Sequence, residues 1–128
     1  MAKTVLLLHT LADGSSHFDW MLERESTGGK RLGLLSFRVS ERVDLGMGDF
    51  CAELLADHRA EYLDYEGDVS GGRGSVQRVA AGMCRILDEQ AGFVRVWVGF
   101  GSRTGEWVGR RREDSVSLWV FSPAHGEA

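Results

Sequence analysis

The amino-acid sequence predicts an all-β, mainly antiparallel protein: a small closed β-barrel of about eight strands, with room for one short helix. Three observations lead to this prediction. Many short segments are apolar or alternate between apolar and polar residues, as strands do. Seventeen glycines and a single proline punctuate those segments, which is typical of turns. Closure is expected because it protects the edges that so many short strands would otherwise expose.

The first part of the chain predicts a hairpin and a further strand. Residues 4–9 form an apolar run that is typical of a strand buried on both faces. Residues 17–23 alternate, which places aromatic and leucine side chains on one face and His17, Asp19, Met21 and Glu23 on the other. A turn sequence at 13–16 joins these two strands. After a turn at Gly28–Lys30, the next strand is expected over 31–39.

The middle of the chain is harder to assign. Residues 48–59 suit a helical face through their apolar spacing, but a strand entering a loop is also compatible. A short strand is expected at Glu61–Tyr65, followed by a glycine-rich loop over Gly67–Gly74. The remaining strands are expected at residues 75–80, 84–87, 93–98, 106–110 and 115–121.

Length and composition predict one domain over residues 1–123, with a loose tail over 124–128. The chain has 128 residues, of which 43% are hydrophobic and 27% charged, as in an ordinary folded soluble domain. Cys51 and Cys84 are too few for a disulfide framework, so both are expected to be small core residues in a reduced, cytoplasmic setting. We expect neither export nor a membrane partner, because every apolar run is short.

The charge balance excludes a wholly basic surface that coats nucleic acid. Fifteen lysines and arginines stand against nineteen acidic residues, which gives a net charge of −4. A local basic patch remains compatible with this balance. The run Arg110–Arg112 could follow a nucleic-acid backbone, or it could be a solvated strand end that Glu113 and Asp114 partly neutralise.

Two histidines and an aspartate form the first candidate site. His17 and Asp19 are two residues apart on a predicted strand and therefore share a face, and the hairpin could place His9 beside His17. Two imidazoles and one carboxylate, with open positions left over, are the ligand set of a catalytic Zn, Mn or Fe site. The alternative is that His17 and Asp19 hydrogen-bond on a solvated strand face while His9 caps a strand end. Spacing alone favours this alternative.

His58 and Tyr62 form the second candidate site. They are four residues apart and share a face in either a strand or a helix. Both could donate hydrogen bonds to a phosphate, and His58 could act as a general acid. Taken alone, a loop histidine beside a half-buried tyrosine is the preferred interpretation. The segment Gly71–Gly74 could present Arg73 to an anion, although a plain turn is again preferred there.

Taken together, these segments resemble the N-terminal 3′-phosphoesterase domain of bacterial DNA ligase D and its stand-alone relatives. The resemblance runs from about Thr4 to Pro123. It rests on His9 followed by HFDWMLE at 17–23, on DHRAEYLDYEG at 57–67, and on GSV at 74–76 after a glycine-rich stretch. The family has HYDFRLE, DHPxxYxDFEG and GTV at the corresponding places. The WVF at 119–121 matches the family's last strand more loosely.

The resemblance implies a small barrel with a hydrophobic interior and a polar active site on its outer surface. It implies a metal-dependent enzyme, typically using manganese, that trims 3′-phosphates and 3′-ribonucleotides from DNA ends before ligation; zinc also suits the ligand set. By position, His9, His17 and Asp19 would hold the metal. His58 and Tyr62 would bind the phosphate and carry catalysis, and we add Arg73 as a phosphate ligand. The expected partners are DNA 3′ ends and separate ligase or polymerase repair proteins.

The sequence also departs from the family. Met21 stands where the family has a phosphate-binding arginine, and methionine can neither donate a hydrogen bond nor neutralise charge. Arg38, Arg59 or Arg73 could substitute. His9 and His17 are further apart than in the family, and the glycine-rich loop is shorter. The alternatives are therefore a DNA-end or repair-partner binding module without catalysis, and a phosphoesterase with a smaller substrate.

Overall fold

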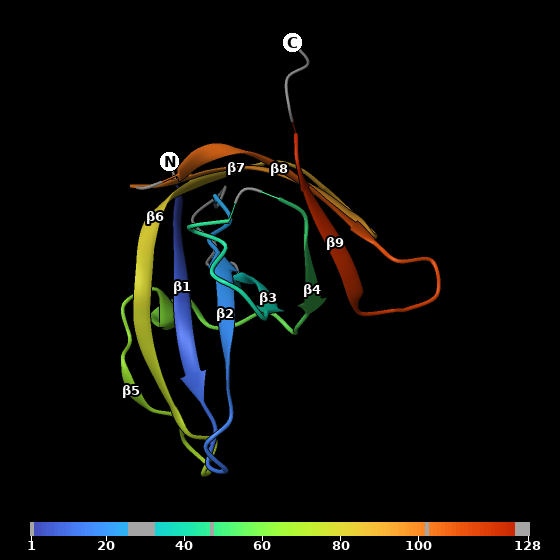
Figure 1. Cartoon of the computed structure of the whole chain (residues 1–128). Coiled ribbons are helices and arrows are strands. Elements are labelled where there is room, and N and C mark those ends of the chain that lie inside the picture. Colours follow the sequence, from blue (N-terminus) through green and yellow to red (C-terminus); the bar gives the residue numbers. More distant parts are fainter. Residues whose placement is uncertain (1, 26–32, 47, 102, 125–128) are drawn as a thin grey trace.

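The computed structural model describes residues 2–25, 33–46, 48–101 and 103–124. Nine antiparallel strands form a single sheet in this part of the chain, which confirms the all-β prediction (Figure 1). The strands are β1 (Ala2–Thr10), β2 (Ser16–Leu22), β3 (Leu35–Val39), β4 (Phe50–Leu54), β5 (Gly67–Asp68), β6 (Ser75–Gln90), β7 (Phe93–Phe100), β8 (Arg103–Arg111) and β9 (Leu118–Pro123).

The sheet closes into a ring, as the sequence predicts. Its strand order is β1-β2-β3-β4-β9-β8-β7-β6, and β6 pairs back onto β1. Strand β5 pairs with β6 and lies outside this ring, which is not evenly arranged round an axis. Closure depends on the length of β6, because its first part pairs with β1 and its second part pairs with β7.

The ring encloses a core to which each of its strands contributes. Trp20, Phe37 and Phe121 lie at its centre and meet edge-to-face. The ring centroids are 5.2 Å apart for Trp20 and Phe121 and 5.0 Å apart for Phe37 and Phe121. The alternating valines of β7 point into this core, as their spacing predicts. Gly109 leaves room for Phe121, since a Cβ at that position would lie 2.5 Å from its ring.

A second, smaller core lies on the opposite face of β1 and β2. Val5, Leu7 and Met21 belong to it, whereas Leu6 and Trp20 belong to the enclosed core. Strand β1 is therefore buried on both faces, as predicted. The cover comes from a segment that includes the 3₁₀ helix η1 (Ala60–Leu63) and β5, which Figure 1 shows beside β1 and β6.

The predicted strand at Glu61–Tyr65 is wrong, because η1 occupies this place. The turn is stabilised by hydrogen bonds from the Tyr62 N–H to the Arg59 carbonyl and from the Asp64 N–H to the Glu61 carbonyl. Tyr62 and Leu63 both pack against this second core, which we call the outer core, and a strand with its alternating side chains would not allow this. The ambiguous segment 48–59 contains β4 and then a loop.

Three other expectations need correction. The strands expected at 75–80 and 84–87 are one strand, β6, in which Gly82 approaches β7 so closely that a Cβ would lie 2.2 Å from the Gly99 carbonyl oxygen. The last strand begins at Leu118, and Val116 before it is 88% exposed. Cys84 is buried as expected, but Cys51 is exposed because its side chain points outward from β4.

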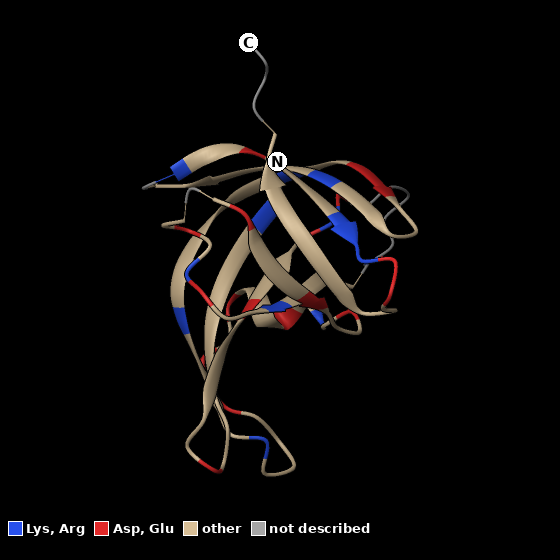
Figure 2. Ribbon diagram, turned by 45° about the vertical axis from the view of Figure 1, so that its right-hand side comes forward, with Lys and Arg blue, Asp and Glu red and all other residues tan. Residues whose placement is uncertain are grey.

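Charged residues of both signs are interspersed over the surface (Figure 2). In the run Arg110–Arg112, the Arg112 guanidinium is paired with Asp114 at 3.0 Å, and the Arg110 guanidinium lies 5.3 Å from the Phe93 ring centroid. These contacts favour the interpretation of this run as a solvated strand end. Among the described helices, none is long and apolar enough to cross a membrane. The turn at Gly28–Lys30 and residues 125–128 of the expected tail lie outside the described residues.

Candidate functional site

The β1–β2 hairpin brings the three predicted metal ligands together. In its register His9 lies opposite His17, and Leu7 lies opposite Asp19, so these side chains share one face of the sheet. The connecting turn is closed by a hydrogen bond from the Leu11 N–H to the Ser15 carbonyl, 2.8 Å long. We call His9, His17 and Asp19 the His–Asp cluster.

The His–Asp cluster has the geometry of a ligand set. The Asp19 carboxylate contacts both rings, with Oδ1 3.1 Å from His17 Nε2 and Oδ2 3.4 Å from His9 Nδ1. One ligand atom from each residue lies within 4.8 Å of the others. It is the one group of three or more such residues found in the part of the chain that the structure describes.

Two buried atoms of this cluster lack a hydrogen-bond partner. They are His17 Nε2 and Asp19 Oδ1, which are close to each other but not aligned for a hydrogen bond. A buried polar atom without a partner costs about 1–3 kcal/mol, and coordination to a cation would satisfy both atoms. Asp19 is only 3% exposed, which contradicts the alternative of a solvated strand face. The residues present therefore fit a divalent metal.

His9 is oriented by a backbone carbonyl. Its Nε2 lies 2.7 Å from the Arg73 carbonyl oxygen. Because a carbonyl can only accept, Nε2 carries the proton, and Nδ1 faces Asp19 as a lone pair in the neutral ring. Metal-bound histidines are commonly oriented in this way by a hydrogen bond from their other ring nitrogen. His9 therefore does more than cap a strand end.

His17 is held in the form that binds a metal. Burial lowers the pKa of His17, and the Asp19 carboxylate only partly opposes this effect. A neutral imidazole is the ligand form of histidine, whereas the protonated ring repels a cation.

Met21 lies on the same face, two residues beyond Asp19, but contributes nothing polar. Its side chain is buried in the outer core with Val5, Leu7 and Leu34. A guanidinium at this position would have to leave that apolar surrounding or be buried in it, and a buried unpaired charge is costly. The residues around position 21 therefore favour an apolar side chain there.

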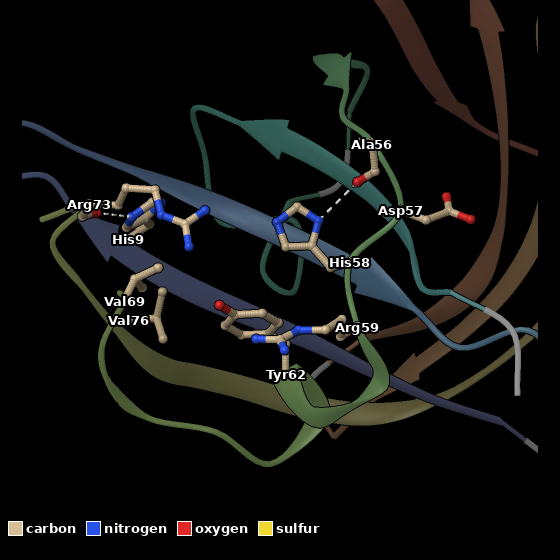
Figure 3. Close-up of a pocket in the computed structure, with 9 residues that line it drawn as sticks. All are labelled: His9, Ala56, Asp57, His58, Arg59, Tyr62, Val69, Arg73 and Val76. Carbon is tan, nitrogen blue, oxygen red and sulfur yellow. Dashed lines mark hydrogen bonds between the residues drawn. The ribbon is translucent and has the colours of Figure 1, made fainter. Parts of the chain in front are cut away.

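A pocket of about 380 Å³ lies between His9, one member of the His–Asp cluster, and the second predicted site. We call it the site pocket (Figure 3). It is lined by His9, Ala56, Asp57, His58, Arg59, Tyr62, Val69, Arg73 and Val76. The structure thus brings His9, His58, Tyr62 and Arg73 together from segments far apart in the sequence.

His58 and Tyr62 lie side by side, with ring centroids 5.7 Å apart in an edge-to-face arrangement. His58 is fixed by a β-bridge to Leu34, and its Nδ1 donates to the Ala56 carbonyl at 3.0 Å. Nε2 is therefore the ring nitrogen left for a ligand. His58 and Tyr62 are therefore close to each other, as predicted, but His58 lies in a loop and Tyr62 in a 3₁₀ helix rather than in one regular element.

Arg73 enters the pocket from the glycine-rich loop (Figure 3). Its Nε and Nη2 donate to the carbonyl and hydroxyl oxygens of Ser70 at 2.7 and 3.1 Å, which leaves Nη1 for a ligand. Gly74 allows the close approach of this loop to β1, because its φ is +89° and a Cβ would lie 1.9 Å from the Thr10 carbonyl oxygen. Arg38, in contrast, is 3.8 Å from Glu53 and does not line the pocket.

Sequence reasoning missed the ion-pair network around Asp57. The Arg24 guanidinium binds the Asp57 carboxylate at 2.8 Å and the Glu89 carboxylate at 2.7 Å. Glu89 and Asp57 raise the pKa of Arg24, which stays charged. The network neutralises the carboxylate that lines the site pocket. Arg24 and Glu89 are 65 residues apart, and their separate sequence contexts contain no motif that joins them.

Comparisons with models of known protein families and with curated proteins find no match to this chain.

Proposed function

We propose that the protein is a divalent-metal-dependent phosphoesterase that removes 3′-phosphates or 3′-ribonucleotides from DNA ends during repair. One observation carries the proposal: His9, a member of the His–Asp cluster, lines a pocket that His58, Tyr62 and Arg73 also line. A metal ligand set beside hydrogen-bond donors and a cation suits a phosphoryl group. The resemblance to the phosphoesterase domain of DNA ligase D supports this choice of substrate.

The residues divide into metal ligands and phosphate ligands. His9 Nδ1, His17 Nε2 and the Asp19 carboxylate would hold the metal, with manganese favoured by the resemblance and zinc compatible with the donors. When bound, the ion would polarise a phosphoryl oxygen and activate a water.

The other residues would act on the phosphate directly. Tyr62 would donate a hydrogen bond to one of its oxygens, and Arg73 would offset its charge through Nη1. His58, hydrogen-bonded through Nδ1, would stabilise developing charge or protonate the leaving oxygen through Nε2.

A second candidate function is a binding module of the same fold that holds a DNA end or a repair partner without cleaving it. The buried Met21 favours this alternative, because it removes the family's arginine from the site. In either case the expected setting is cytoplasmic, with ligase and polymerase activities supplied by separate proteins.

Phosphate release tests the proposal. Purified protein is incubated with manganese and a primer–template that ends in a 3′-phosphate. We expect release by the wild type, loss of release in His17→Ala, and wild-type release in Asp88→Asn, which removes an exposed carboxylate on β6. Equal release by His17→Ala and the wild type would contradict the proposal. No release together with retained DNA binding would support the binding module.

A further inference from the structure

A second hollow adjoins the site pocket. It has a volume of about 270 Å³ and shares Arg59 and Tyr62 with that pocket. Its lining residues are Arg59, Glu61, Tyr62, Tyr65, Asp68 and Ser70. A ligand whose phosphate lies in the site pocket can therefore extend past these two shared residues into the second hollow.

Arg59 places an available positive charge at the boundary between the two hollows. The structure shows neither a hydrogen bond nor an ion pair from its guanidinium to any residue that it describes. The carboxylate of Asp57, which lines the site pocket, is bound by Arg24. In Figure 3 the Arg59 side chain extends toward Tyr62. An anion at this boundary would meet a cation that no described carboxylate neutralises.

Tyr65 offers a fixed aromatic surface in the second hollow. Its hydroxyl donates to the Asp68 carbonyl, and its ring meets the Tyr62 ring edge-to-face with centroids 5.8 Å apart. Tyr65 is nevertheless 39% exposed, so part of the ring is free for contact. Every nucleobase has a π-face that can stack on such a ring.

The carboxylates of the second hollow indicate which part of a ligand it takes. Glu61 and Asp68 disfavour a phosphate in its interior, but they can accept hydrogen bonds from base amino groups. A ligand with its base in the hollow can bind these carboxylates, and its phosphate can stay outside the hollow, beside Arg59.

We propose that the second hollow binds the terminal nucleoside of a nucleic-acid strand whose 3′-phosphate lies in the site pocket. The base lies on Tyr65, and Arg59 binds the 5′-phosphodiester of the same nucleotide. The inference rests on the proposed function for the identity of the first phosphate. It makes the substrate a polynucleotide strand and not a small phosphomonoester.

Binding of a 5′-fluorescein-labelled single-stranded DNA with a 3′-phosphate, followed by fluorescence anisotropy at fixed salt and in EDTA, tests the proposal without turnover. We expect Arg59→Gln and Tyr65→Leu each to weaken binding about tenfold. Tyr65→Phe keeps the ring and should bind like the wild type. Arg110→Gln is the matched control, because it removes an exposed arginine from β8.

Competition with a nucleoside 3′-monophosphate separates the two contacts. This ligand has a base but no 5′-phosphodiester, so Tyr65→Leu should weaken its binding as much as it weakens that of DNA, whereas Arg59→Gln should weaken it less than it weakens that of DNA. Absent binding by the wild type would overturn the inference, and so would variants that lose no more affinity than Arg110→Gln. Arg59→Gln decides the question if Tyr65→Leu does not fold. Failure of the proposed function would instead appear as absent phosphate release with manganese.

Discussion

At the scale of single residues, the β1–β2 hairpin contains buried polar groups with a partner and, in the His–Asp cluster, two without one; elsewhere among the described residues, Arg103 Nε and Trp119 Nε1 also lack a partner. Thr4 is fully buried, and its hydroxyl donates to the Met21 carbonyl at 2.8 Å while accepting from Trp20 Nε1 at 3.0 Å. Asp19, on the adjacent strand, leaves Oδ1 without a hydrogen bond. This contrast within one hairpin supports a metal at Asp19, because the fold satisfies buried polar groups nearby.

Cys84 provides a test of burial at the residue scale. Burial raises the pKa of its thiol to about 12, from an ordinary value of 9.0. The unfolded chain therefore loses this proton near pH 9, whereas the folded protein keeps it. The contribution of Cys84 to stability is fully present below pH 9 and is lost as the pH rises toward 12.

Urea unfolding of the wild type and of Cys84→Ala between pH 8 and pH 11 measures this effect. We expect the free energy of unfolding of the wild type to fall more steeply above pH 9 than that of the variant. Cys51→Ala is the matched control, since Cys51 is exposed and its removal should leave the slope unchanged. Parallel curves for the wild type and Cys84→Ala would show that the buried thiol ionises as it does in the unfolded chain.

At the scale of elements, the site depends on the contact between the end of β1 and the start of β6. His9 and Thr10 pair with Val76 and Ser75. The loop that precedes β6 supplies the Arg73 carbonyl that orients His9. Gly74 makes this contact possible through its positive φ and its missing side chain.

Gly74→Ala should therefore disturb the metal site without changing any ligand. A Cβ at this position clashes with the Thr10 carbonyl and forces the two segments apart, which moves the adjacent Arg73 carbonyl away from His9. We expect metal affinity to fall by about 10- to 100-fold, as is typical when an outer hydrogen bond to a ligand is lost. Calorimetric titration with Mn²⁺ measures this change.

Gly14→Ala is the control for backbone strain. Gly14 has the same φ of +89°, but a Cβ there would meet nothing within 4 Å. Both variants pay the cost of a left-handed alanine, about 1–2 kcal/mol, and only Gly74→Ala adds the steric clash. Equal metal affinities in the two variants would refute the role given to Gly74.

The elements that the sequence predicted well are those defined by local pattern. The alternation at 17–23 and the apolar run at 4–9 are each enough to define a strand, and the register of the hairpin then unites the His–Asp cluster. The helix η1 could not be predicted in this way, because Tyr62 and Leu63 are placed by packing against the distant outer core. The continuity of β6 depends on its change of partner from β1 to β7, which no local pattern encodes.

At the scale of the whole molecule, ring closure and the candidate site are parts of the same construction. The strands that close the ring, β1 and β6, also carry His9 and border the site pocket. The burial of Asp19 could not be predicted from its own strand, because the residues that cover this face come from about Leu63 to Val76. The sequence therefore indicated which residues could be ligands, but not the pocket that joins His9 to His58 and Tyr62.

The net charge also has to be interpreted at this scale. A chain of net charge −4 is not suited to coating nucleic acid, and Figure 2 shows charges of both signs spread over the surface. Around the site pocket, however, Arg24 neutralises Asp57 while Arg59 and Arg73 have no carboxylate partner among the described residues. A local excess of positive charge is sufficient for a phosphate, especially beside a metal ion.

Metal binding by the His–Asp cluster is the central claim, and isothermal titration calorimetry with Mn²⁺ and with Zn²⁺ tests it most directly. We expect the wild type to bind one ion per chain. Asp19→Asn and His17→Ala should each weaken binding by at least about 100-fold, more than the loss of an outer hydrogen bond. Asp88→Asn, on the surface of β6, should bind like the wild type. Absent binding by the wild type, or wild-type affinity in both Asp19→Asn and His17→Ala, would contradict metal binding by the His–Asp cluster.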